Sequence, residues 1–159
     1  MPVIKLSTEI HAPIVRVFDL ARSIDLHQRS MSHTNEKAIA GRTSGLIKLG
    51  ETVTWEAVHF GITQRLTSKI TVCESPVHLQ DVMETGAFKR FTHDHYFSEV
   101  ASETMMEDIF DYDSPFGLFG SIADQLFLER YMAGLLEKRN QLIKTVAEGE
   151  GWRDFLSTG

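Results

Sequence analysis

Hydrophobic and polar residues alternate most clearly in residues 53–72, a stretch that the Phe-Gly pair at positions 60 and 61 divides in two. Alternation with this period places successive side chains on opposite faces of a β-strand. We therefore predict two antiparallel strands joined by a tight turn, with one buried face and one solvent-exposed face. His59 and Gln64 fall among the hydrophobic residues of the buried face. The register that follows pairs Trp55 with Leu66, Ala57 with Gln64 and His59 with Ile62.

The same alternation predicts further strands over residues 3–11, 77–84, 88–99 and 103–113, and a weaker pattern predicts one over residues 33–40. Three glycines at residues 41–50 indicate turns between two of these strands. A turn at residues 100–102 sets the pairing of the last two strands. In that register His95 lies opposite Asp108, His93 opposite Phe110 and Phe97 opposite Met106.

Helical spacing appears at both ends of the chain. After Pro13, apolar residues recur at positions 14, 17, 18 and 21, which predicts a short helix. A second short helix is predicted over residues 23–30, with Ser23 as its N-cap. A long helix is predicted over residues 120–148, with a buried stripe of Leu128, Met132, Leu135, Arg139, Leu142 and Val146 that Leu136 and Ile143 widen. Its first half is apolar on nearly every side, so both sides need to be covered. The sheet can cover one side, and loops, a ligand or a second subunit can cover the other.

This order of elements is typical of an α+β fold, in which a curved antiparallel sheet of about six or seven strands wraps around the long C-terminal helix. We expect a single domain over residues 1–148 and a C-terminal tail over residues 149–159. Four stretches of the sequence, residues 12–23, 53–71, 81–97 and 114–124, resemble the SRPBCC superfamily. This superfamily groups START-related, birch-pollen-allergen-like and polyketide-cyclase-like proteins, and the last three stretches resemble a bacterial branch without an assigned function.

The resemblance implies the helix-grip fold and a cavity between the sheet and the long helix. Members of the superfamily hold lipids, sterols, polyketides or plant hormones in that cavity, and a few catalyse cyclisation or dehydration. Because they share no universal catalytic motif, no residue is transferred as catalytic. We expect a protein that binds a small hydrophobic molecule of lipid, polyketide or aromatic type.

Composition excludes several other classes of function. Hydrophobic residues make up 42% and charged residues 24% of the 159 residues, and the net charge of -6 disfavours nucleic acid as a partner. A single cysteine, Cys73, rules out an internal disulfide and agrees with a cytoplasmic protein. The sequence shows no signal peptide and no apolar run of the roughly 20 residues that a membrane span needs. We therefore expect no membrane insertion. The sequence allows a homodimer but does not predict one.

The predicted inward faces define a candidate ligand site. An apolar pocket with a few polar groups is typical of small-molecule sites, in which aromatic rings supply contact area and imidazoles or amides orient the ligand. The alternative is that these polar groups only satisfy one another inside the sheet. The set comprises Trp55, His59, Gln64, Leu66, Phe91, His93, His95, Phe97, Met106, Asp108 and Phe110, roofed by Ile122, Leu126 and Phe127.

Two further kinds of chemistry are considered for the same residues. His93 and His95 share one strand face and His59 can approach them, so three imidazoles can in principle hold zinc. Histidines two residues apart are common by chance, so we expect neither a metal nor a cofactor. His95 paired with Asp108 can act as a general base in a cyclase or dehydratase, but a structural hydrogen bond is the simpler interpretation. Asp81 has an ambiguous strand register and can face either way. A third alternative is an interaction module that uses the apolar first half of the long helix.

Overall fold

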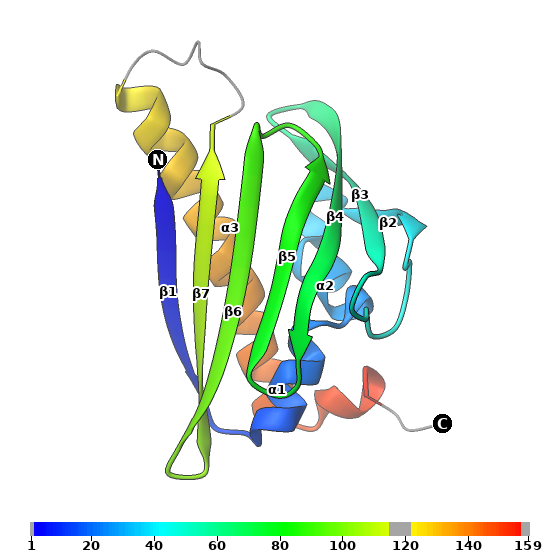
Figure 1. Cartoon of the computed structure of the whole chain (residues 1–159), viewed down its shortest axis with the longest axis vertical. Helices are drawn as coiled ribbons and strands as arrows, with labels where there is room; N and C mark the ends of the chain where they lie inside the picture. Colours follow the sequence, from blue (N-terminus) through cyan, green and yellow to red (C-terminus); the bar gives the residue numbers. More distant parts are fainter. Residues whose placement is uncertain (1, 115–121, 157–159) are drawn as a thin grey trace.

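In a computed structural model, the described residues form seven strands and three α-helices. The structure describes residues 2–114 and 122–156, with the backbone alone for residues 122–124. Figure 1 shows the three helices on one side of a single twisted sheet. The strands are β1 Val3–Ile10, β2 Lys37–Gly41, β3 Thr52–His59, β4 Ile62–Glu74, β5 His78–Thr85, β6 Arg90–Val100 and β7 Glu103–Asp113. The helices are α1 Ile14–Ala21, α2 Ile24–Ser30 and α3 Ile122–Glu148, with short 3-10 helices at Ser32–Thr34 and Gly151–Asp154.

The sheet is antiparallel throughout, with the strand order β1-β7-β6-β5-β4-β3-β2. β1 therefore forms one edge of the sheet, next to β7, and the short β2 forms the opposite edge. α3 crosses the inner face, as Figure 1 shows. This arrangement confirms the predicted fold class, a curved antiparallel sheet around a long C-terminal helix with two short helices after the first strand.

Both predicted hairpin registers are confirmed. Trp55 pairs with Leu66, and the pairs nearer the following turn agree with the prediction. In the last hairpin His95 lies opposite Asp108 and His93 opposite Phe110. The N-terminal helices also begin as predicted: α1 follows Pro13, and the Ser23 hydroxyl accepts a hydrogen bond from the Leu26 amide at 3.2 Å.

Two local predictions were confirmed only in part. The strand predicted over residues 33–40 is a 3-10 helix, Ser32–Thr34, followed by β2, because Asn35 adopts a left-handed conformation that separates the two segments. The buried face of α3 contains Leu136, Arg139, Ile143 and Val146 of the predicted stripe, but it also includes Asn140 and Ala147, which were not predicted. Leu135 and Leu142 are only half-buried. The fully covered face consists of Leu136, Arg139, Asn140, Ile143, Val146 and Ala147.

The core divides into two apolar clusters along the sheet. The larger cluster joins α1 and α2 to the inner face of the sheet, with Phe18 and Met106 fully buried at its centre. The smaller cluster joins Phe91, Phe110 and Tyr112 to Leu136 of α3. Residues beyond 148 pack back on the larger cluster, where the Arg16 guanidinium lies 4.2 Å from the Trp152 ring centroid. Among the described helices, none has both the length and the hydrophobicity that crossing a membrane requires.

Candidate functional site

A cavity of about 970 Å³ lies between the inner face of the sheet and α3. Strands β3, β4 and β6 supply most of its floor, and Leu128, Met132 and Leu136 of α3 lie above it. α2 and the segment that follows it close one side through Ile24, Met31 and neighbouring side chains. Carbon atoms therefore form most of the wall, as in the sites that proteins use for small organic ligands.

Nine of the residues proposed from the sequence line this cavity. Eight of them reach it because the alternation along β3, β4, β6 and β7 sends every second side chain to the inner face, whereas Phe127 reaches it from α3. They are Trp55, His59, Gln64, Leu66, Phe91, His93, His95, Phe110 and Phe127.

Four of the proposed residues do not line the cavity. Phe97 is 3% exposed and packs edge-on against Phe18, with ring centroids 5.3 Å apart, because α1 covers that end of the sheet. Met106 is buried in the same cluster for the same reason. Asp108 is 1% exposed and lies behind the two imidazoles rather than in the wall. Leu126 is 48% exposed on the outer side of α3. The side chain of Ile122 lies outside the described residues.

Three polar side chains meet in the wall of the cavity. His93 and His95 point inward from β6 with ring centroids 3.9 Å apart, and Asp81 lies opposite His93 on β5. One carboxylate oxygen of Asp81 is 3.4 Å from His95 Nε2 and 3.9 Å from His93 Nδ1. The Asp81 side chain is 19% exposed, so this group is reached from the cavity.

A second carboxylate supports the two imidazoles from behind. Asp108 Oδ1 lies 3.0 Å from His93 Nε2 and 2.7 Å from His95 Nδ1. The first contact is a hydrogen bond, whereas the His95 nitrogen is misaligned for one and contributes a charge contact. Asn140 of α3 donates its amide N–H to Asp108 Oδ2 at 2.6 Å. Each imidazole therefore has one carboxylate near each of its ring nitrogens.

Arg139 completes this buried group. Its guanidinium donates to the Ala21 carbonyl at 3.0 Å and to the Asn140 side-chain oxygen at 3.1 Å. It also lies 3.7 Å from Asp108 Oδ1. The network thereby ties β6 and β7 to α3 and to the end of α1.

Burial and the neighbouring charges act against each other on the pKa of these groups. Burial raises the pKa of Asp108, but the contacts with His93 and His95 outweigh burial and hold it well below its usual range. The pKa of Asp81 is lowered for the same reason, against burial, by His95 and His93. Burial and the charge of His95 lower the pKa of His93. For His95, burial and Arg139 act downward, but contacts with Asp108 and Asp81 raise the pKa overall. Both carboxylates are therefore ionised at neutral pH.

Aromatic side chains from the β3–β4 turn and α3 meet at the opposite end of the cavity. His59 Nδ1 and the Tyr131 hydroxyl are hydrogen-bonded at 2.6 Å, with burial lowering the pKa of His59 and raising that of Tyr131. Phe60 contacts the Tyr131 ring at 4.6 Å and the Phe127 ring at 5.7 Å between centroids. Phe60 and Phe127 are exposed, so this end of the wall reaches the molecular surface.

The polar contacts described above involve four side chains that were not assigned to the site from the sequence, those of Tyr131, Arg139, Asn140 and Asp81. Tyr131 follows Phe127 by four residues, which places both on one helix face and was an available signal. Arg139 was placed in the buried stripe of α3 without a partner. Asn140 gave no signal. Asp81 was left open because its strand register was ambiguous from the sequence, and the structure shows register shifts between β4 and β5.

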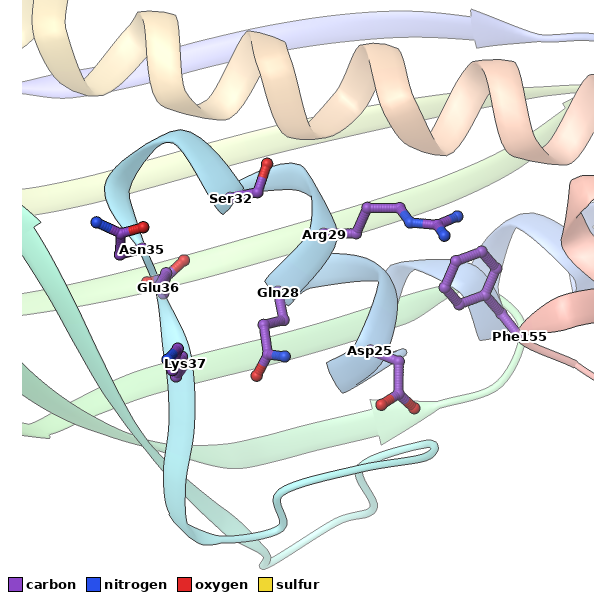
Figure 2. A pocket seen from close by; sticks show the side chains of 8 residues that line it. All are labelled: Asp25, Gln28, Arg29, Ser32, Asn35, Glu36, Lys37 and Phe155. Atoms are coloured by element: carbon purple, nitrogen blue, oxygen red, sulfur yellow. The ribbon is translucent and has the colours of Figure 1, made fainter.

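A second pocket lies on the surface near α2 and has a volume of about 510 Å³. Figure 2 shows its wall, formed by α2, the segment around Asn35 and the ring of Phe155. The guanidinium of Arg29 lies 5.3 Å from the Phe155 ring centroid and occupies one side. Charged and polar side chains form most of this open hollow, so the larger cavity is the stronger candidate for an apolar ligand.

Comparison with known proteins agrees with this architecture. No protein-family profile matches the sequence. No curated protein matches it either. A solved structure from Thermus thermophilus is 16% identical, has a TM-score of 0.70, and is matched over 92% of this chain and 99% of that chain. A START superfamily protein from Mycobacterium smegmatis is 8% identical, with a TM-score of 0.69 and coverage of 92% and 97%. The ginseng (Panax ginseng) major latex-like protein 151 is 12% identical, with a TM-score of 0.65 and coverage of 93% and 98%. At these identities the likeness concerns the fold.

Proposed function

We propose that this chain, which has the helix-grip fold of the SRPBCC superfamily, binds a small and mainly apolar molecule between its sheet and α3. The observation that carries the proposal is the cavity of about 970 Å³ with its predominantly hydrocarbon wall. Binding pockets for organic ligands typically have volumes of about 300–1,000 Å³.

The cavity is too large to be a packing defect, which favours a ligand site. Protein interiors are close-packed, and the few voids in them rarely exceed the size of a water molecule. An apolar space of this volume is unfavourable when empty, because its lining loses van der Waals contacts, and water inside it finds few partners. An apolar ligand restores those contacts.

The polar side chains in the wall favour a ligand with a polar group at one end. His93, His95 and Asp81 lie together at one place in a mainly apolar wall. Hydrogen bonds from such a group fix the orientation of a ligand, whereas the surrounding surface supplies most of its affinity. At the other end, Phe60 and Phe127 offer exposed aromatic surface that an apolar molecule contacts as it enters.

Filling the cavity tests this proposal. Ala57 lies in the wall, while Val58 follows it on the opposite face of β3 and is absent from the wall. We expect wild-type protein to bind the apolar fluorophore 1-anilinonaphthalene-8-sulfonate at one saturable site, because the site is preformed. The substitution Ala57→Phe should weaken that binding by about tenfold or more, since each 1.4 kcal/mol of lost contact is a factor of ten.

Val58→Phe is the matched control, with the same introduced ring one residue away. It should leave the dissociation constant within about twofold of wild type, with far-UV circular dichroism showing that both variants fold. Equal binding by the two variants would place the fluorophore outside the cavity and contradict the proposal.

A further inference from the structure

Asp81, His93 and His95 have the composition and spacing of a metal centre. The three side chains each offer one donor atom, and these atoms lie within 4.8 Å of one another. Four-coordinate zinc with bonds of about 2.0–2.1 Å requires donor atoms about 3.3 Å apart. The distances from Asp81 Oδ1 to His95 Nε2, 3.4 Å, and to His93 Nδ1, 3.9 Å, come within a small side-chain adjustment of that value.

The surroundings of the two imidazoles match those of metal-binding histidines. A ligating histidine usually directs its second ring nitrogen to a carboxylate, which fixes the ring and strengthens the donor. On the side away from Asp81, Asp108 Oδ1 is hydrogen-bonded to His93 Nε2 at 3.0 Å and makes a charge contact with His95 Nδ1 at 2.7 Å. Because Asn140 fixes the other oxygen of Asp108, the nitrogens near Asp81 are presented to the cavity in a set position.

The charge of the group also favours a cation. The group contains two carboxylates, those of Asp81 and Asp108. Its one permanent positive charge is the guanidinium of Arg139, which lies 3.7 Å from Asp108. When both imidazoles are deprotonated, as metal ligation requires, the two carboxylates outnumber the one guanidinium and the buried group is anionic. Arg139 directs its hydrogen bonds to Ala21 and Asn140 and contacts Asp108 rather than the gap between Asp81 and the imidazoles.

We infer that Asp81, His93 and His95 bind a divalent transition-metal ion in the wall of the cavity, with Asp108 as the partner that orients the two imidazoles. Two imidazoles and one carboxylate suit zinc, iron(II) or cobalt(II) better than magnesium or calcium, which prefer oxygen donors alone. Three protein donors leave coordination positions open, as in catalytic rather than structural zinc sites. Those positions face the cavity, where an oxygen-bearing group of an organic ligand can occupy them.

The third metal donor in the structure is Asp81, whereas the sequence suggested His59 for that role. His59 is hydrogen-bonded to Tyr131. Asp81 is available instead because β5 pairs it directly with His93. The metal site goes beyond the proposed ligand binding and is tested without any organic ligand, so either can fail while the other holds.

Zinc binding to the full chain without a histidine tag provides the test. After removal of bound metal with EDTA and then of EDTA, the protein is dialysed against Zn²⁺ and its metal content measured by mass spectrometry. We expect one tightly bound zinc per chain. Asp81→Asn keeps the shape of the side chain but removes its charge, and it should weaken zinc binding by at least about tenfold.

Two matched variants guard against zinc bound elsewhere. His78→Ala removes a histidine–carboxylate pair on the outer face of the sheet, in which His78 lies 2.7 Å from Asp94. His11→Ala removes the exposed group of Glu9, His11 and Glu103, the other place in the described residues where donor atoms gather. Both variants should bind zinc as wild type does. No stoichiometric binding by wild type, or a loss in His11→Ala but not in Asp81→Asn, would overturn the inference.

A second measurement covers the case in which Asp81→Asn does not fold. Imidazole resonances of wild-type protein are followed by NMR as Zn²⁺ is added. Shifts of His93 and His95 at one equivalent support the site. Shifts confined to His11, His78 or other histidines contradict it.

Discussion

Asp108 is the residue on which the buried polar network depends. From the sequence we placed it opposite His95, and the pairing is correct, but its role was interpreted incompletely. It contacts both imidazoles, and Asn140 and Arg139 approach it from α3. Strand alternation identifies an inward-facing carboxylate, whereas its partners on a helix more than 30 positions away depend on how that helix is rotated.

Asn140 should be essential for stability. Asn140→Ala removes the hydrogen bond of 2.6 Å to Asp108 and leaves a buried carboxylate oxygen without its donor. We expect the free energy of unfolding to fall by about 2–3 kcal/mol, the typical cost of losing a hydrogen bond to a buried charge. Urea denaturation measures this, with Gln141→Ala at the exposed neighbouring position as control. A loss as small as the roughly 0.5 kcal/mol expected of the control would show that Asp108 needs no donor from α3.

Variants of Phe97 and Phe91 distinguish a role in core packing from a role in the cavity wall. They are inward-facing residues of β6, but Phe97 packs against Phe18 whereas Phe91 lines the cavity. Phe97→Leu should lower the free energy of unfolding by about 1–3 kcal/mol, with little change in fluorophore affinity. Phe91→Leu should change that affinity as well. If both variants bind the fluorophore equally, the division of the inner face that we describe is incorrect.

At the scale of elements, the hairpins were predictable because their information is local. Alternation over residues 53–72 and 103–113 fixes which side chains face inward, and short turns fix the register. The position of α3 and part of its buried face were predicted, but Asn140 and Ala147 on that face were not. Its buried face centres on Leu136, Asn140 and Ile143, and a polar residue at the centre of a buried face cannot be recognised from hydrophobic spacing alone.

The turn region between β2 and β3 gives a prediction for glycine conformation. Gly41 and Gly45 both have a φ of +73°, a conformation that costs an L-residue about 1–2 kcal/mol. A Cβ at Gly41 would overlap the carbonyl oxygen of Thr52, while one at Gly45 would meet nothing within 4 Å. We expect Gly45→Ala to cost about 1 kcal/mol and Gly41→Ala about 3 kcal/mol or more. Thermal and urea unfolding compare the two, and similar losses would show that β2 adjusts without strain.

At the scale of the whole molecule, the cavity lies on the inner face of the sheet, where the apolar residues form two separate clusters. The larger cluster fills the space under α1 and α2, and the smaller one joins β6 and β7 to α3. Residues such as Trp55 and Leu66 line the space between them. The sequence indicates which side chains face inward. It does not show which of them pack in the core and which line the cavity, because that depends on how far the two clusters extend. Phe97 and Met106 were therefore assigned to the site although they belong to the core.

The central claim is that a small apolar molecule enters this cavity, and methyl NMR tests it most directly. The fluorophore 1-anilinonaphthalene-8-sulfonate is titrated into protein with labelled isoleucine, leucine and valine methyl groups. We predict the largest shifts at Leu66, Ile70 and Leu136 in the wall, with little change at the buried core residues Ile10 and Val17. Shifts restricted to exposed methyl groups such as those of Leu49, Val77 and Val100 would contradict the account.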